Sequence, residues 1–211
     1  MTKTLRVPKA DFENLDLDSA LELYGARFDV NEVNWPAEWP YAPICAGRIA
    51  RSDDALVVDF RVSGLDLRAQ NLKDNGRQWE DSCVEFFVKD PSTDDYYNFE
   101  INPLGKILAC YGPAREGRKK RSPSQMEKIL RISSVEGPQE FDGGVFTWRV
   151  AVVIPFGLIG IDPDNMPESI RANFYKCGDK SAHPHFVSWN PVDTPKPDFH
   201  VPACFGTLIL K

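Results

Sequence analysis

The sequence lacks several features that would place it in common classes of protein. No apolar run approaches the roughly 20 residues that a membrane-spanning helix needs, so we expect no membrane-spanning segment. Basic residues are not in excess: the formal net charge is −6 and the isoelectric point is about 5.2, which argues against nucleic-acid binding. The one basic run, residues 115–121, lies between Gly and Pro residues and is predicted to be a solvated loop.

Cysteine and histidine patterns also exclude several kinds of site. The five cysteines are odd in number and have no metal-type spacing, so we predict no disulfide framework, which favours a reducing compartment. His183 and His185, together with His200, suggest an H-x-H metal site, but the intervening Pro184 and the absence of a matching Glu favour an ordinary loop. The N-terminus shows no apolar segment typical of a signal peptide, and both a cytoplasmic and a secreted location stay open.

Short segments rich in β-forming residues make up most of the sequence. The chain has 211 residues with 17 prolines and 14 glycines, which divide the sequence at short intervals. Turn signals stand at Arg51–Asp54 and at Asp142–Gly144, each between two such segments. This pattern predicts an all-β antiparallel sandwich, of the immunoglobulin or jelly-roll kind. The expected strands cover residues 43–51, 55–63, 82–89, 96–102, 106–111, 129–136, 145–154, 170–177, 185–190 and 205–210.

Helix signals are weak. Residues 124–128 and 155–159 could each form a turn or two of helix. Residues 1–30 contain alternating apolar and polar positions, at 15–18 and 21–23, which indicate an extended arm packed on the sandwich. No linker or repeat is visible, so residues 1–211 are predicted to form a single domain of about the size expected for a β-sandwich.

Three segments alternate so that polar side chains gather on one face. Successive side chains of a strand point to opposite faces of the sheet. Residues 83–88 place Val84, Phe86 and Val88 on one face and Glu85 on the other, and residues 97–102 and 171–175 repeat this separation. If these strands share a sheet, one face carries two carboxylates, an arginine and several amides. Such a face beside an aromatic ring suits a sugar, whose C–H face packs on the ring and whose hydroxyls need hydrogen-bond partners.

The order of these segments resembles carbohydrate-binding module family 9, a family of DOMON-like domains. The segment from Trp79 to Phe87, WEDSCVEFF, is similar to the family's W-x-D-[DS]-x-V-E-[FI]-F segment, and residues 96–105 resemble the strand pair that follows. Residues 172–176 and 188–208 resemble the closing region, so the similarity runs from about residue 40 to the C-terminus. The resemblance implies a β-sandwich that binds glycan ends without catalysis, often attached to a glycoside hydrolase.

The resemblance also suggests which residues bind. Members of the family hold a sugar between two tryptophans, and Trp79 matches the first of these, with Glu85 as the carboxylate six positions later. The second aromatic position falls near Phe199 and His200 rather than on a tryptophan, and Trp189 is the nearest tryptophan. The candidate ligand-binding residues are Trp79, Glu85, Asn98, Glu100, Asn102, Arg171, Asn173, Trp189, Phe199 and His200.

Two other functions stay open. Glu85 and Glu100 form a pair of carboxylates of the kind that glycosidases use, although no glycosidase motif accompanies them. A third possibility is a structural module that contacts other domains through the same face. We expect no cofactor; a calcium ion that pins loops would be compatible with the resemblance, but no Asp-x-Asp-x-Asp signature names its ligands.

Overall fold

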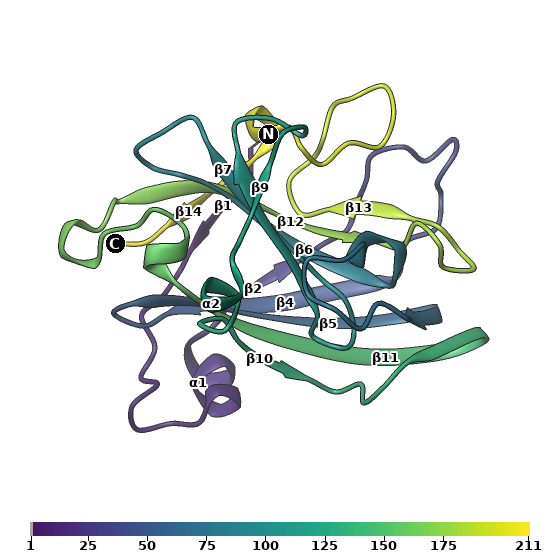
Figure 1. The fold of residues 1–211 in the computed structure, drawn as a ribbon, viewed down its shortest axis with the longest axis horizontal. Coiled ribbons are helices and arrows are strands. Elements are labelled where there is room, and N and C mark those ends of the chain that lie inside the picture. Colours follow the sequence, from purple (N-terminus) through teal and green to yellow (C-terminus); the bar gives the residue numbers. More distant parts are fainter. Residues whose placement is uncertain (1) are drawn as a thin grey trace.

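The chain folds as two packed β-sheets in a computed structural model that describes residues 2–211 (Figure 1). The first sheet has the strand order β1-β14-β12-β6-β7-β8-β9, and β13 and β3 extend it beside β12. Its strands are β1 (Thr4–Arg6), β3 (Glu32–Val33), β6 (Cys83–Lys89), β7 (Tyr96–Ile101), β8 (Ile107–Gly112), β9 (Lys119–Lys120), β12 (Ser169–Cys177), β13 (Phe186–Ser188) and β14 (Gly206–Ile209).

The second sheet has the order β10-β11-β5-β4-β2. Its strands are β2 (Ala26–Asp29), β4 (Ile44–Arg51), β5 (Ala55–Ala69), β10 (Leu130–Ser133) and β11 (Gln139–Pro155). Neighbouring strands run antiparallel except β1 and β14, which are parallel. The predicted antiparallel sandwich is therefore confirmed, and every predicted strand segment overlaps an observed strand.

The main core lies between the two sheets. Val84, Phe86 and Val88 of β6 and Phe174 of β12 face Phe60 and other apolar side chains of the second sheet, and all are buried. The alternation of apolar positions read from the sequence is thus confirmed for the first sheet. Its other face, the outer face, carries Cys83, Glu85, Phe87, Tyr96, Asn98, Glu100, Tyr175 and Cys177.

Loops cover much of the outer face. Trp35, Val192, Phe199 and Phe205 come from segments before β4 and after β13 and pack with the aromatic side chains of β6, β7 and β12 into a second buried cluster. The alternating polar residues of the outer face would also suit a sheet whose outer side is exposed to solvent. Both faces of β6 are instead buried, because two distant loops fold over it.

Two sequence expectations about local structure are wrong. Residues 17–24 are not extended but form helix α1 (Leu17–Tyr24), which covers the outside of the second sheet (Figure 1). Asp16 caps this helix by accepting a hydrogen bond from the Ser19 amide at 2.9 Å. Leu21 is 1% exposed and Leu23 is 68% exposed, whereas an extended arm would place both on one face.

The second correction concerns Asp142–Gly144. These residues do not form a turn between strands but lie within β11, at a register shift between Asp142 and Phe146. Gly143 has φ +78°, a left-handed conformation that glycine adopts readily, as expected at a bulge. The turn at Arg51–Asp54 and the short helical turns α2 (Pro123–Met126) and η2 (Phe156–Leu158) agree with their predictions. Among residues 2–211, no helix has the length and apolar character needed to cross a membrane.

Candidate functional site

A cavity of about 630 Å³ opens on the outer face where the covering loops leave it bare. Its floor comes from adjacent strands, with Glu85 from β6, Asn98 and Glu100 from β7, and Cys177 from β12. Glu85 lies directly opposite Glu100 in the β6–β7 pairing and opposite Tyr175 in the β6–β12 pairing. The strand register therefore places the two carboxylates side by side.

Loops supply the walls of the cavity. One contributes Trp79, which lies in the short helix η1 (Gln78–Glu80), is half-buried and packs against the second cluster. Another, between β8 and β9, contributes Arg115 and Arg118, and the segment before β14 contributes Phe199 and His200. The floor is thus polar and acidic, while the walls carry aromatic and basic side chains together with Asp179 and Asp198.

The two floor carboxylates are almost completely buried. Glu85 is 4% exposed and Glu100 is 5% exposed. Burial raises the pKa of Glu85 well above its usual range, and the neighbouring Cys177 and Glu100 raise it further. Burial also raises the pKa of Glu100 to about 7, against the hydrogen bond from Asn98 and the charge of Arg118, which lower it. Two adjacent carboxyl groups in such a site do not both ionise easily.

Only part of the hydrogen-bonding capacity of this floor is used. Asn98 Nδ2 donates to Glu100 Oε1 at 2.9 Å, and Cys177 Sγ donates to Glu85 Oε1 at 3.1 Å. Glu100 Oε2 is buried and has no hydrogen-bond partner in the structure. Because buried polar atoms are normally paired, this oxygen is the clearest sign of a missing partner.

Arg118 holds one wall in place. Its guanidinium stacks over the Tyr96 ring at 3.9 Å, and its Nε donates to Asn98 Oδ1 at 2.8 Å. The remaining nitrogens donate to the carbonyls of Tyr96, Gly112 and Ala114 at 2.7–3.1 Å. The prediction that residues 115–121 form only a solvated loop is therefore wrong for Arg118, which fixes the orientation of the Asn98 amide.

The neighbouring part of the wall is aromatic. Phe199 stacks on Tyr175 with ring centroids 4.2 Å apart, and His200 Nδ1 lies 2.9 Å from Tyr96 Oη. Burial lowers the pKa of His200 to about 4, and the charges of Arg118 and Arg115 lower it further. His200 is therefore neutral at pH 7.

Six of the sequence-predicted binding residues meet at this cavity, and four do not. Those that line it are Trp79, Glu85, Asn98, Glu100, Phe199 and His200. Asn102 is buried near η1, where it donates to Asp81 at 2.9 Å and to the Asn71 carbonyl at 2.8 Å. Trp189 lies on the other side of the first sheet, in the main core against Phe174.

Arg171 and Asn173 lie on the expected face of β12 but away from the cavity. Arg171 stands four residues from Tyr175, about 13 Å along the strand, and donates to the carbonyls of Phe205 and Gly206. Asn173 is buried and bonds to the Asn190 amide and carbonyl at 2.9 and 3.0 Å. Both hold the C-terminal segment against the sheet.

Sequence reasoning missed Arg118, Tyr96, Cys177 and Asp179 of the site region. Tyr96 and Cys177 follow from the same alternation that identifies Asn98 and Tyr175, so that signal was present. Arg118 and Asp179 lie in loops, where no periodicity indicates direction. The three histidines each have a different polar neighbour: His183 contacts Asp66, His185 contacts Lys176, and His200 contacts Tyr96.

Comparison with known proteins agrees with this architecture. The chain is similar to a provisionally assigned carbohydrate-binding protein from Bacteroides uniformis, with 35% identity, a TM-score of 0.91 and 100% of each chain covered. It also shares its fold with a family 9 carbohydrate-binding module from Caldicellulosiruptor kristjanssonii solved with glucose (14% identity, TM-score 0.61, 99% and 96% covered). The same organism's module with cellotriose gives 14% identity and a TM-score of 0.59, with 99% and 94% covered.

No curated protein matches the chain. The sequence profile of carbohydrate-binding family 9, however, matches residues 17–210, nearly the whole chain. This chain therefore belongs to carbohydrate-binding family 9.

Proposed function

We propose that the cavity on the outer face binds a sugar without catalysis. Glu85, Asn98 and Glu100 supply hydrogen-bond acceptors and donors at the floor, and the Trp79 indole packs against the C–H face of the ring. The observation that carries this proposal is the unpartnered Glu100 Oε2 at the bottom of an open cavity. A buried acceptor without a partner costs free energy, and a ligand hydroxyl would satisfy it.

The site is preorganised for such a ligand. Arg118 fixes Asn98, and Asn98 in turn bonds Glu100, so the polar groups keep their orientation before any ligand arrives. This lowers the ordering cost of binding. A cavity of about 630 Å³ lies within the range of small-ligand sites, about 300–1,000 Å³.

A glycoside hydrolase is the alternative, and the raised pKa values of Glu85 and Glu100 favour it. Hydrolysis, however, requires two carboxyl groups that flank the scissile bond. Here both carboxylates come from directly paired positions on one sheet face, so both would approach a sugar from the same side. This arrangement supports binding over hydrolysis. An attached or co-encoded glycoside hydrolase stays a prediction.

The test is calorimetric titration of the full chain with glucose, with cellotriose and with a wider set of soluble oligosaccharides. We expect Glu100→Gln to lose at least about tenfold in affinity, since a hydrogen bond to a charged group contributes about 1.5–3 kcal/mol and 1.4 kcal/mol is one decade. Trp79→Ala should lose a similar factor through the removed ring. Two exposed residues away from the cavity, Glu127 and Phe141, provide matched controls as Glu127→Gln and Phe141→Ala.

A reducing-sugar assay on the same samples separates the alternatives. Binding without release supports the proposal. Sugar release by the natural chain that disappears in Glu100→Gln would establish the hydrolase instead. The absence of binding to every oligosaccharide, in a folded protein, would favour a structural module and overturn the proposal.

A further inference from the structure

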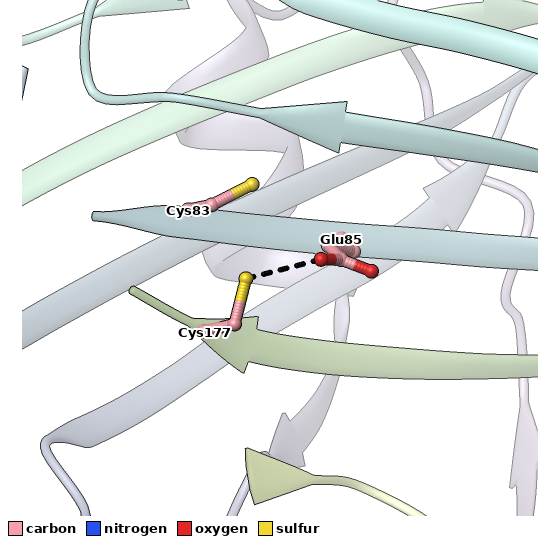
Figure 2. A group of neighbouring side chains, drawn as sticks. All are labelled: Cys83, Glu85 and Cys177. Carbon is pink, nitrogen blue, oxygen red and sulfur yellow. Dashed lines mark hydrogen bonds between the residues drawn. The ribbon is translucent and has the colours of Figure 1, made fainter. Parts of the chain in front are cut away.

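Two cysteines and one glutamate lie close together on the outer face of the first sheet (Figure 2). Cys83 of β6 is directly opposite Cys177 of β12 in the antiparallel pairing, and Glu85 is two residues along β6 on the same face. The sulfur atoms of both cysteines and a carboxylate oxygen of Glu85 all lie within 4.8 Å of one another. All three residues are buried. Within residues 2–211 they are the one group of three or more His, Cys, Asp or Glu residues whose possible metal-binding atoms lie this close together.

We propose that Cys83, Glu85 and Cys177 bind a zinc ion. The ligand atoms of one tetrahedral zinc ion stand about 3.5–3.8 Å apart, given Zn–S distances of about 2.3 Å and Zn–O distances of about 2.0–2.2 Å. The Cys177 sulfur and the Glu85 oxygen are already 3.1 Å apart, so only small side-chain movements are needed. Two sulfur ligands favour zinc over hard cations such as calcium and magnesium.

Zinc binds cysteine as the thiolate and glutamate as the carboxylate. A zinc ion supplies the positive charge that favours these ionised forms, and each of the three ligands that carries a proton beforehand gives it to solvent on binding.

The position of the cluster indicates what the ion would face. Glu85 and Cys177 line the cavity, whereas Cys83 does not. Three protein ligands leave the fourth position of a tetrahedral ion free, and here that position opens toward the cavity. Zinc sites that keep one position for water or a ligand have this composition of three protein groups. A hydroxyl-bearing molecule in the cavity could therefore complete the coordination.

The experiment uses the reduced, chelator-treated full chain and zinc or cobalt ions alone, without any glycan. Its result is therefore independent of the proposed carbohydrate binding. We expect one equivalent of zinc to bind and to raise the melting temperature. Cobalt in the same site should give a sulfur-to-metal charge-transfer band and the visible spectrum of a tetrahedral ion, while calcium and magnesium should bind far more weakly.

Variants assign the ligands. Loss of an outer-shell partner lowers metal affinity about 10–100-fold, so Cys83→Ser and Cys177→Ser should each lower it at least that much, and Glu85→Gln should lower it while leaving the sulfur band. Cys110→Ser is the matched control, since Cys110 also lies at the cavity but outside the cluster. It should bind zinc as the natural chain does.

Three results would overturn the proposal. One is a natural chain that shows neither a zinc-induced melting shift nor a cobalt–sulfur band, a result that stands even if a cysteine variant fails to fold. Another is a cobalt–sulfur band that persists in the Cys83→Ser/Cys177→Ser double variant. The third is an equal loss of zinc affinity in Cys110→Ser.

Discussion

At the scale of single residues, buried polar groups of the first sheet separate into two kinds. Asn173 is fully satisfied: its side chain bonds the Asn190 amide and carbonyl at 2.9 and 3.0 Å and the Phe174 amide at 3.0 Å. Glu100, on the same face, keeps one oxygen without a partner. A satisfied buried group holds structure together, whereas an unsatisfied group at a cavity is free for a ligand.

This difference predicts that Asn173→Ala destabilises the fold without affecting the cavity. The unfolding free energy should fall by about 1–3 kcal/mol, because the Asn190 backbone groups lose their partner in a buried place. Urea denaturation measures the loss, and glycan titration at a temperature where the variant is folded should give the affinity of the natural chain. The exposed Asn31→Ala serves as control. A fall in glycan affinity as large as that of Trp79→Ala would contradict this division.

The lowered pKa of His200 predicts that the protein loses stability in acid. The pKa of His200 is lowered to about 4, by burial and by the charges of Arg118 and Arg115, against Asp198, which raises it. The His200 ring also lies within hydrogen-bonding distance of the Tyr96 hydroxyl. Between its ordinary pKa of about 6.5 and pH 4, the unfolded chain takes up a proton that the folded chain does not. His200 therefore lowers stability as the pH falls through this window and has no such effect above it.

The measurement compares the pH dependence of unfolding for the natural chain and His200→Phe. The difference in unfolding free energy between the two should be constant above about pH 7 and should shift in favour of His200→Phe toward pH 4. Because other titrating groups are common to both proteins, the difference isolates His200. A difference that does not change between pH 7 and pH 4 would contradict the assignment.

At the scale of elements, the close packing of β4 between β2 and β5 requires a glycine at one position. Gly47 of β4 pairs with Phe60 of β5 and Phe28 of β2. A Cβ atom at this position would lie 2.2 Å from the Asp59 carbonyl oxygen and 2.3 Å from the Phe28 ring. Neither neighbour can yield easily, since one is backbone and the other is a buried aromatic ring.

Gly47→Ala should therefore weaken the second sheet. We expect a loss of at least about 1–3 kcal/mol, typical of overpacking a filled site. Gly157 offers the control, because a Cβ there meets nothing within 4 Å. Gly157→Ala should be neutral or slightly stabilising. Thermal unfolding of the two variants makes the comparison, and equal melting temperatures would refute the packing argument.

At the scale of the whole molecule, aromatic stacking joins the two sheets. Phe28 of the second sheet stacks on Phe174 of the first with ring centroids 3.9 Å apart and an angle of 9° between the rings. Phe174 also contacts Phe60, Phe86 and Trp189. On its opposite side, β12 carries Tyr175 and Cys177 toward the cavity. The strand that anchors the sandwich thus also supports the site.

Phe174→Ala should cost about 3–5 kcal/mol of stability, the range for truncating a buried Phe. Phe141→Ala removes an exposed ring, 47% accessible, and should change stability by less than about 0.5 kcal/mol. Urea denaturation followed by both tryptophan fluorescence and circular dichroism should show one coincident transition in each protein. A loss below about 1 kcal/mol for Phe174→Ala would show that the stack does not hold the sheets together.

Local patterns in the sequence were enough for the strands and their faces. Alternation has a period of two, and this period alone assigns Glu85, Asn98 and Glu100 to the face opposite Phe86 and Phe99. The same patterns misread α1, where the cap at Asp16 and the burial of Leu21 outweigh a short alternation. They also misread Asp142–Gly144, because a glycine-rich bulge and a glycine-rich turn have similar composition.

Tertiary structure alone decided which polar groups of that face line the cavity. Strand register, which joins residues far apart in the chain, sets Glu85 beside Glu100 and Cys83 beside Cys177. Long-range loop packing leaves the cavity open and covers the rest of the face. It also turns Arg118 inward and carries Trp189 into the core. None of these outcomes follows from local periodicity, because each depends on contacts between distant segments that compete for the same surface. The sequence by itself therefore determined a family 9 sandwich with an acidic, aromatic-bordered face, and the fold determined which residues of that face line the cavity.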